Sequence, residues 1–383
     1  MIKSKIFKYL ENVNQGCLEI ITPENQKVII GDKNSQLKAN IKINDWSLLS
    51  RSAARGDIGF GEGYMLGLFT TDNLIDLLSF FVVNQEKLED IFHGNLFISF
   101  VSAIGNLFRR NTIKGSKKNI SFHYDISNDF FSLWLDPSMT YSSGIFFNSN
   151  DDLTTAQQNK YSRILSNIPS ENKSILEIGC GWGGFLENAA KKNHQLTALT
   201  LSKEQRQFAI DRLEKQNLSA QILLEDYRHH QHQYDNIVSI EMFEAVGKQY
   251  WPTFFNQIKS LLKKDGKAMI QTITIDDRAF DKYCKTNDFI RKYIFPGGFL
   301  PSENIFENLA KASGLEMIDK FDFAHSYYQT LKIWLDNFNN KLPAIKQLGF
   351  DDLFVRKWQF YLAYCAAGFY GKRTNVLQYS FVA

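Results

Sequence analysis

The middle of this chain alternates short apolar runs with longer helical stretches, and this alternation restricts the fold more than any other feature. Apolar runs of strand length lie at 174–178, 195–201, 221–224, 236–240 and 267–273, and helical stretches are expected at 184–192, 203–216 and 251–262. Strands that alternate with helices pair in parallel, because each helix returns the chain to the same end of the sheet. We therefore expect an α/β fold with helices on both faces of a parallel sheet.

Residues 1–108 lack this alternation and are expected to form a separate small α+β unit. Short strands are expected at 18–21, 27–30 and 39–43, and helices at 73–83 and 85–108. The glycine-rich segment 55–67 is interpreted as a turn or a close backbone approach. The basic segment 109–119 is the best candidate for a linker between domains. Its alternative role is a patch that binds phospholipid headgroups, at about 1 kcal/mol per basic residue near an anionic surface.

Charge and composition exclude several classes of protein. The 44 lysines and arginines nearly balance the 41 aspartates and glutamates, which is too even for a dedicated nucleic-acid binder. The four cysteines are scattered without a C-x-x-C pair, which argues against a disulfide framework or a zinc site. The first residues lack a signal-peptide core, and the longest apolar runs are shorter than the roughly 20 residues of a spanning helix. We expect a soluble, cytoplasmic protein whose 32 phenylalanines fill a large core or an apolar cavity.

A glycine-rich turn follows the first strand of the alternating region. In E-I-G-C-G-W-G-G, Gly179 and Gly181 allow a tight turn and a close approach of a ligand to the backbone. The same spacing fits a dinucleotide fingerprint. Glu177 could face the cationic methionine end of S-adenosylmethionine, and the tip of the second strand, at Thr200 and Leu201, lacks the acid with which NAD enzymes bind ribose. Adenosylmethionine sites usually have such an acid too, so the turn favours a methyltransferase without excluding an NAD enzyme.

Motifs on both sides of this turn resemble those of cyclopropane-fatty-acyl-phospholipid synthases. They lie, in the family's order, at 123–131, 135–142, 201–205, 226–228, 241–247 and 293–302. The resemblance covers about residue 120 to the C-terminus and extends more loosely over residues 1–108. It implies a Rossmann-like class I S-adenosylmethionine-dependent methyltransferase domain at 120–383, with an acyl-chain-binding insertion at about 275–340. The N-terminal unit would be a small domain associated with lipid or with homodimer formation.

The resemblance also assigns the residues that bind S-adenosylmethionine. The segment at Tyr141 and Ser142 would cover the cofactor, the glycine turn would line it through the backbone, and the tip of the second strand would hold its methionine and ribose region. With Glu177, which its place before the glycine turn selects, the full set is Tyr141, Ser142, Glu177, Gly179, Gly181, Thr200, Leu201, Gln205 and Tyr227, the last beside the adenine.

In this family the methyl group is added to a cis double bond inside a lipid acyl chain, which leaves positive charge on carbon. That cation must be shielded from water and surrounded by negative or π-rich groups. Closing a cyclopropane ring then needs a base that removes a proton from the new methyl group. The family uses a bicarbonate held by a cysteine, a glutamate, a histidine, a tyrosine and a backbone group. The corresponding residues are Ser143, Glu244, Gln271, Tyr327 and the backbone of Ile273.

Ser143 and Gln271 depart from the family pattern. Both can form hydrogen bonds, so an anion is not excluded, but glutamine cannot carry a proton as histidine does. The chain is similar to a branch of the family that makes methyl-branched acyl chains, including precursors of furan fatty acids. We therefore expect methylation of an unsaturated phospholipid acyl chain at the inner membrane surface, with cyclopropanation as the alternative. A methyltransferase for a small soluble acceptor and a non-catalytic lipid-binding relative are the other classes considered.

Other candidate residues have simpler explanations. The histidines at 229, 230 and 232 lack further ligands at suitable spacing, and they are interpreted as a solvated loop instead of a metal site. Glu241 could share a helix face with Glu244, but the family motif matches only Glu244, so the role of Glu241 is left open. His123 and Asp125 either act in catalysis or order a helix. The aromatic residues of 280–306 and 334–338 either pack in the core or line an acyl-chain tunnel.

Overall fold

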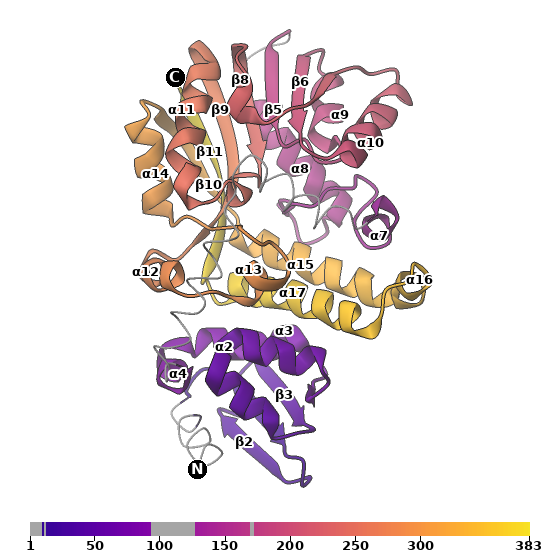
Figure 1. Ribbon diagram of the computed structural model, residues 1–383, viewed down its shortest axis with the longest axis vertical. Helices are drawn as coiled ribbons and strands as arrows, with labels where there is room; N and C mark the ends of the chain where they lie inside the picture. Colours follow the sequence, from indigo (N-terminus) through magenta and orange to yellow (C-terminus); the bar gives the residue numbers. More distant parts are fainter. Residues whose placement is uncertain (1–9, 11–12, 93–126, 169–171) are drawn as a thin grey trace. The chain divides into compact units, whose positions relative to one another are not determined.

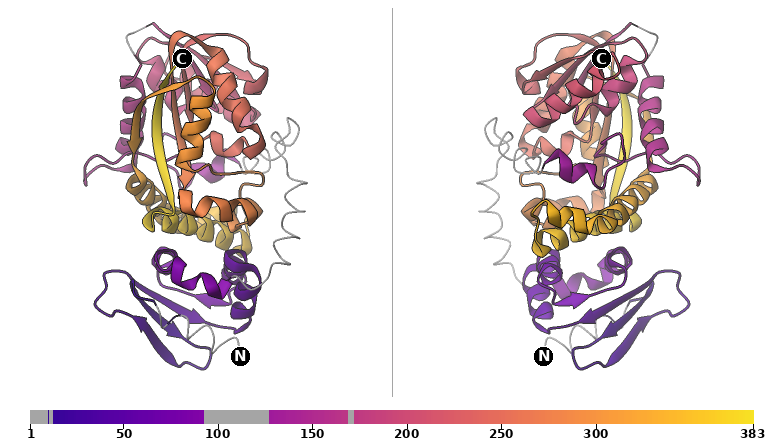
Figure 2. Two further views of the ribbon diagram at one scale, coloured as in Figure 1. Left: turned by 90° about the vertical axis from the view of Figure 1, so that its left-hand side faces the viewer. Right: turned by 90° about the vertical axis from the view of Figure 1, so that its right-hand side faces the viewer.

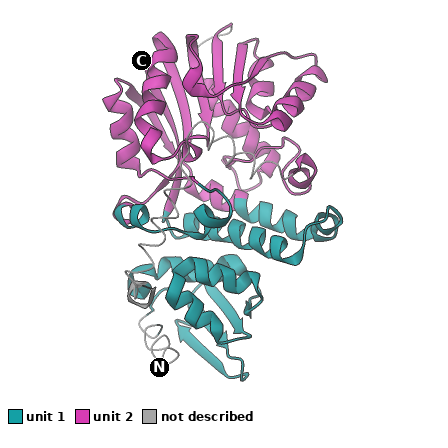
Figure 3. Ribbon diagram, in the orientation of Figure 1, with its two compact units in different colours: residues 1–108, 281–296, 331–373 teal, residues 109–280, 297–330, 374–383 magenta. Residues whose placement is uncertain are grey.

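The computed structural model describes residues 10, 13–92, 127–168 and 172–383. The chain divides into two compact units, which Figure 3 draws in different colours. The first unit contains residues 1–108, 281–296 and 331–373, and the second contains 109–280, 297–330 and 374–383. The N-terminal residues thus share a unit with two segments that the sequence analysis assigns to the catalytic domain. The basic segment 109–119, His123 and Asp125 lie outside the described residues.

The second unit is built on a seven-stranded sheet in the order β10-β11-β9-β8-β5-β6-β7 (Figure 1). The strands are β5 (Ser174–Ile178), β6 (Gln195–Thr200), β7 (Gln221–Leu224), β8 (Tyr234–Ile240), β9 (Leu262–Ile275), β10 (Glu316–Asp322) and β11 (Thr374–Val382). Strands β5 to β9 pair in parallel, whereas β11 is antiparallel to β9 and to β10. The strand order changes direction at β5, and in sheets of this kind ligands bind beyond the carboxyl ends of the strands at such a point.

Helices cover both faces of this sheet, as the turned views in Figure 2 show. On one face α8 (Leu153–Ser166), α9 (Gly184–Ala190) and α10 (Lys203–Glu214) share a core with β5, β6 and β8. The buried positions of α8 recur every three or four residues, which is the pattern of an amphipathic helix. Asp152 begins α8 by accepting a hydrogen bond from the backbone N–H of Thr155.

Aromatic side chains form the core on the other face of the sheet. Helices α11 (Trp251–Leu261) and α14 (Glu303–Ala312) carry part of this aromatic cluster, which consists of Phe243, Phe254, Phe255, Phe306 and Phe381. All five side chains are at most 1% exposed, and three of the ring pairs have centroids 5.0 Å apart. Pairs of this kind contribute about 0.5–1.5 kcal/mol each beyond their buried area. Part of the phenylalanine excess therefore packs in this core.

The N-terminal part of the first unit is a small α+β structure. Strands β1 (Cys17–Ile21), β2 (Lys27–Gly31), β3 (Lys38–Ile43) and β4 (Phe69–Thr70) form a sheet in the order β2-β1-β3-β4. Helices α2 (Ser47–Met65), α3 (Leu74–Val83) and α4 (Gln85–Phe92) accompany it. Of the two alternatives predicted for 55–67, the turn is wrong for most of its length, because α2 continues to Met65 and only Gly56, at φ 57°, interrupts it. The close backbone approach is confirmed at Gly61.

The glycines of α2 serve helix packing instead of a turn. A Cβ atom on Gly61 would lie 2.5 Å from the ring of Phe289 and 2.8 Å from the ring of Phe360. These rings belong to α13 (Phe289–Tyr293) and α17 (Asp352–Tyr370) of the same unit. Helix α16 (Leu342–Gln347) completes the unit, and α12 (Asp277–Lys285) and α15 (Ala324–Asn340) each have residues in both units.

The aromatic segments of the sequence contain many core residues. Phe289, Phe306, Trp334 and Phe338 are fully buried. Phe289 packs on Phe360 with ring centroids 4.6 Å apart. For these four residues, core packing accounts for the aromatic side chains.

The predicted elements of the second unit agree closely with the structure. Strands β5 and β7 match their predicted ranges residue for residue, and α9, α10 and α11 end within two residues of prediction. Several elements of this unit have no predicted range: β10, β11, α8, α14, the short helix α7 (Asn128–Ser132) and the 3₁₀ turns η1 (Tyr227–His229), η2 (Phe243–Ala245) and η3 (Lys248–Tyr250). Within the described ranges, none of the helices combines the length and apolar character needed to cross a bilayer.

Candidate active site

The carboxyl ends of β5, β6, β7 and β8 border a pocket with about 1180 Å³ of empty space, part of it open to solvent. All nine residues that the sequence analysis assigns to the cofactor line this pocket: Tyr141, Ser142, Glu177, Gly179, Gly181, Thr200, Leu201, Gln205 and Tyr227. The structure therefore brings together residues from the segment before α8 and from the ends of three strands, β5, β6 and β7.

Two glycines shape the wall of the pocket after β5. Gly179 has φ +85° and Gly181 has φ +51°, a conformation that residues with side chains rarely adopt. A Cβ on Gly179 would lie 2.8 Å from Cγ of Met242, whereas a Cβ on Gly181 would meet no atom within 4 Å. The first glycine thus allows close packing with the chain, and the second leaves open space where a ligand can approach the backbone.

Glu177 places a buried carboxyl group in the wall of the pocket. Its side chain is 3% exposed, and no described residue donates a hydrogen bond to its Oε2. Burial raises the pKa of Glu177 to about 8, and the charge of Lys160 acts in the opposite direction. A buried carboxylate oxygen without a donor is stabilised by a cationic ligand. This orphaned oxygen therefore fits the positively charged methionine end of S-adenosylmethionine.

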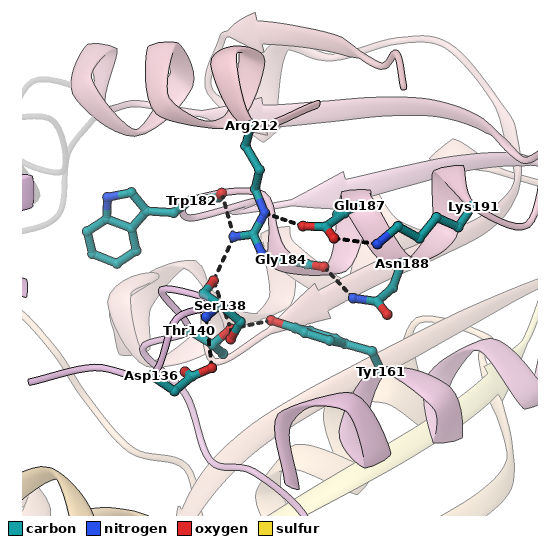
Figure 4. A network of polar contacts seen from close by, with 10 residues as sticks. All are labelled: Asp136, Ser138, Thr140, Tyr161, Trp182, Gly184, Glu187, Asn188, Lys191 and Arg212. Atoms are coloured by element: carbon teal, nitrogen blue, oxygen red, sulfur yellow. Dashed lines mark hydrogen bonds and ion pairs between the residues drawn. The ribbon is translucent and has the colours of Figure 1, made fainter. Parts of the chain in front are cut away.

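The segment 136–143 borders the pocket beside the glycine turn, and Arg212 of α10 anchors it (Figure 4). The Arg212 guanidinium donates to the carbonyl oxygen of Ser138 at 2.6 Å and to the carboxylate of Glu187 at 2.6 Å. Burial opposes ionisation of Glu187, but hydrogen bonds from Lys191 and Arg212 lower its pKa to about 2. Arg212 also donates to the carbonyl oxygen of Trp182, so one cation joins the segment, the glycine turn and α9.

Helix α8 holds the same segment from the side of the core. The Tyr161 and Thr140 hydroxyl oxygens lie 2.8 Å apart, Gln157 donates from Nε2 to the carbonyl oxygen of Ser142 at 2.9 Å, and Lys160 donates from Nζ to Oγ of Ser142 at 2.6 Å. Sequence reasoning selected Ser142 but missed Gln157 and Lys160. The signal that could have found them is two polar residues on the apolar stripe of an amphipathic helix.

Glu241 lies at the centre of the predicted catalytic residues. Its Oε1 accepts hydrogen bonds from the backbone N–H of Ser143 at 2.9 Å and from Nε2 of Gln271 at 2.7 Å. Its Oε2 accepts a hydrogen bond from the hydroxyl of Tyr327 at 2.7 Å. Burial raises the pKa of Glu241, and the Tyr327 hydrogen bond opposes that shift. The resemblance assigns Ser143, Gln271 and Tyr327 to the binding of bicarbonate. In the structure these three residues instead surround Glu241, for which the sequence suggested no definite role.

Glu244 has a different environment. The Thr272 hydroxyl donates to its Oε1 at 3.0 Å, and the backbone N–H of Ile273 donates to the same oxygen. Its Oε2 is buried, and no described residue donates to it. Burial raises the pKa of Glu244 to about 8, and the nearby charge of Glu241 adds to the shift. When two carboxyl groups lie near each other, ionisation of one raises the pKa of the other, so one tends to be a carboxylate while the other stays protonated.

The turn that carries both carboxyl groups is fixed from three sides. Glu241 has φ +50°, an uncommon conformation for a residue with a side chain, and its N–H donates to the carbonyl oxygen of Gln271. Phe243 anchors the turn in the aromatic cluster. The carbonyl oxygen of Glu244 accepts a hydrogen bond from the N–H of Phe299 at 2.8 Å. The position of Glu241 is therefore maintained by core packing at some cost in backbone strain.

Ser143 contacts the site through its backbone N–H and not through its hydroxyl group, which takes the place of the family's cysteine. Its hydroxyl donates to the carbonyl oxygen of Gly144 at 2.8 Å, and only its backbone N–H contacts Glu241. His229 and His232 are exposed, as expected of a solvated loop, whereas His230 is buried, with Nε2 2.8 Å from the Tyr234 hydroxyl. Among the residues that the structure describes, no group of three or more potential ligands could hold a metal ion.

Comparisons with known proteins agree with this geometry. Residues 111–379 match the family described as Mycolic acid cyclopropane synthetase. The tuberculostearic acid methyltransferase UfaA1 of Mycobacterium tuberculosis is 34% identical over 351 residues, which cover 88% of this chain and 81% of that protein. The cyclopropane-fatty-acyl-phospholipid synthase of Escherichia coli is 32% identical over 352 residues, which cover 91% of this chain and 89% of that protein.

Solved structures give the same result. The cyclopropane synthase MmaA2 from Mycobacterium tuberculosis has a TM-score of 0.66 at 27% identity and covers 70% of this chain and 98% of its own. The mycolic acid cyclopropane synthase CmaA1, complexed with SAH and CTAB, has a TM-score of 0.65 at 29% identity and likewise covers 70% of this chain and 98% of its own. The pocket and these similarities identify the cofactor as S-adenosylmethionine and the chemistry as methylation or cyclopropanation of unsaturated acyl chains in lipids. The chain belongs to the cyclopropane synthase family of S-adenosylmethionine-dependent lipid methyltransferases.

Proposed function

We propose that this protein transfers the methyl group of S-adenosylmethionine to a double bond in an unsaturated acyl chain of a membrane phospholipid and releases a methyl-branched chain. The observation that carries the proposal is the Glu241 carboxylate, which receives hydrogen bonds from Ser143, Gln271 and Tyr327. These are donors that the family resemblance assigns to bicarbonate. Because they already converge on a carboxylate of the chain, they do not fit a separate bicarbonate, and we propose Glu241 as the base.

Bound S-adenosylmethionine supplies an electrophilic methyl group. Its addition to one carbon of the double bond leaves positive charge on the other carbon. If Glu241 removes a proton from the added methyl group at once, a cyclopropane ring closes. If a hydride first shifts from the methylated carbon to its neighbour, loss of a proton from an adjacent chain carbon leaves a methyl-branched alkene, and loss of a proton from the methyl group leaves a methylene branch. Each route moves one proton to Glu241 and needs neither an oxidant nor a reductant.

The other residues of the site orient these groups. Glu244, whose pKa of about 8 keeps it largely neutral at pH 7, fixes the backbone of β9 through Ile273. When S-adenosylmethionine is bound, Tyr141 and Ser142 would cover it, and the backbone at Gly179 and Gly181 would line it. Thr200, Leu201 and Gln205 would hold its methionine and ribose region, and Tyr227 would contact the adenine.

Two observations favour the branched product over the ring. The relative with 34% identity is named a tuberculostearic acid methyltransferase, and Gln271 replaces the histidine expected of ring-closing enzymes. Cyclopropanation is the second candidate, because the phospholipid cyclopropane synthase of E. coli matches over 91% of this chain. The name of that relative also supports phospholipid as the substrate class, and with it a peripheral position at the inner membrane surface.

The experiment is incubation of the protein with methyl-labelled S-adenosylmethionine and vesicles of monounsaturated phospholipid, followed by proton NMR of the released acyl chains. The proposal expects label in the lipid and methylene or methyl-branch resonances. High-field cyclopropyl proton resonances would show that the product is a cyclopropane ring, which contradicts the branched product and supports the second candidate. Label that stays in water-soluble material, in parallel with methylation of a lipid-free acceptor, would contradict both.

A further inference from the structure

Lys160 is a buried cation that the chemistry described above does not use. It lies on the inward face of α8, its side chain is 0% exposed, and its Nζ donates to Oγ of Ser142 at 2.6 Å. The same nitrogen lies 4.7 Å from the ring centroid of Tyr161. A lysine of this kind is costly to bury, so it requires compensating negative charge nearby.

Three carboxyl groups supply that charge, and each comes from a different element. Asp136 precedes α8 in the segment 136–143, Glu177 is the second-last residue of β5, and Glu241 follows β8. Each of the three stabilises the Lys160 ammonium electrostatically, although burial is the larger effect and lowers the pKa of Lys160 to about 7. Asp136 Oδ1 and Glu177 Oε2 are buried without a donor among the described residues. Lys160 is thus a buried cation that interacts electrostatically with three acidic groups of the site.

The position of Lys160 connects the two halves of the site. Through Ser142 it contacts the segment that lines the cofactor pocket. Ser142 is followed by Ser143, whose N–H donates to Glu241 at 2.9 Å, so the same hydrogen bond from Lys160 also holds the backbone that contacts Glu241. The charge of Lys160 acts on the same carboxylate. A cation near a carboxylate favours the ionised form of that carboxylate, and a base must be ionised before it can accept a proton.

We propose that Lys160 is a positioning residue for the reaction, whose ammonium group fixes Ser142 against the cofactor pocket and holds Glu241 in its ionised, proton-accepting form. This inference rests on the proposed role of Glu241 as the base. The pH dependence of Glu241 is set by the titratable groups around it, which are Lys160 of α8, Tyr327 of α15 and Glu244 of η2. Lys160 in turn interacts with Asp136, Glu177 and the ring of Tyr161.

The test compares pH profiles of kcat for the wild type, Lys160→Met and Ser142→Ala. Lys160→Met keeps the length of the side chain and removes its charge. The ionised fraction of Glu241 then falls at a given pH, so the acid limb of the profile should move upward by about one pH unit or more, with kcat recovering at high pH. Ser142→Ala removes the hydrogen bond and keeps the charge. It should raise KM for S-adenosylmethionine and leave the acid limb in place.

A purely structural role predicts a different result. Lys160→Met would then lower kcat by the same factor at every pH, and that outcome overturns the proposal. If Lys160→Met does not fold, infrared difference spectra of the wild type give the answer. The protonated-carboxyl band of Glu241 is assigned at low pH, as the band of the wild type that Glu241→Gln lacks. This band should be absent from the wild type at neutral pH, and its presence there overturns the proposal. This band is read without substrate, so it separates a failure of this inference from a failure to methylate lipid.

Discussion

Replacing Glu241 by glutamine removes the proposed base while changing the shape of the site very little. The carboxylate accepts three hydrogen bonds, two on Oε1 from Ser143 and Gln271 and one on Oε2 from Tyr327. A glutamine oxygen at the Oε1 position keeps the first two. Its NH₂ group then faces the Tyr327 hydroxyl, which can accept a hydrogen bond instead of donating one. We expect the stability of Glu241→Gln to stay within about 1 kcal/mol of wild type, because loss of charged hydrogen bonds is offset by removal of a desolvated charge.

The expected effect on catalysis is much larger. Loss of a general base lowers the rate by about 10²–10⁴, which corresponds to roughly 3–5 kcal/mol at about 1.4 kcal/mol per tenfold change. The assay is transfer of labelled methyl groups to monounsaturated phospholipid vesicles at saturating S-adenosylmethionine. Tyr327→Phe is the matched control, because it removes one hydrogen bond to the carboxylate and leaves the carboxylate in place. We expect it to cost about tenfold.

A second variant turns the same reasoning into a rescue experiment. Glu241→Gly relieves the positive φ of this position and leaves the donors of Ser143, Gln271 and Tyr327 around an empty volume. Added bicarbonate or formate should therefore restore part of the activity of Glu241→Gly but not that of Glu241→Gln, whose side chain fills the space. Glu241→Gln with undiminished kcat would refute the assignment of this residue as the base.

Three further predictions concern stability and cofactor binding. The folded-state pKa of Glu187 is about 2, below its unfolded value, so its contribution is complete above that unfolded value and is lost as the pH falls through the folded pKa. Arg212→Met should accordingly cost about 2 kcal/mol at pH 7 in urea unfolding and much less near pH 2. Phe306→Ala should cost about 3–5 kcal/mol, measured in the same way, because it opens a cavity in the aromatic cluster. A Cβ in Gly184→Ala would lie 2.4 Å from the Tyr161 hydroxyl; its displacement should raise the calorimetric Kd for S-adenosylmethionine about fivefold, and an unchanged Kd would contradict the anchoring role of that hydroxyl.

The sequence predicted the pocket well because its signals are local. The glycine turn after β5 and the short motifs after β6 and β7 each lie at the end of a strand, and parallel pairing alone brings such ends together. The residues assigned to the cofactor therefore line one pocket even though the strand order itself was not predicted.

The arrangement around Glu241 depends on contacts that are distant in sequence, so no local pattern reveals it. Glu241 receives Gln271 from β9 and Tyr327 from α15, at sequence separations of 30 and 86. The motif match selected Glu244 because the family has a glutamate there. The motif match could not show that the hydrogen-bond donors Gln271 and Tyr327 would contact Glu241 and not Glu244.

Tertiary packing also explains the error at 55–67. Glycine-rich sequence favours a turn when considered alone, since glycine destabilises a helix by roughly 1 kcal/mol relative to alanine. Here Gly61 permits contact with the rings of Phe289 and Phe360, and the gain from burying those rings exceeds that cost. The signal for a helix therefore lay more than 200 residues away in the chain.

The contact of Gly61 with Phe289 and Phe360 determines whether the protein can be truncated to its catalytic part. Phe289 and Phe360 are fully buried, and Gly61 of α2 covers both of them within one compact unit. A protein truncated before residue 109 would keep every catalytic motif and yet expose this aromatic surface, which favours aggregation. Supplying residues 1–108 as a separate polypeptide should restore solubility. The N-terminal residues therefore act like a subunit that is covalently joined to the rest of the enzyme. Their removal should first lower the yield of soluble protein, and the loss of activity should follow from that.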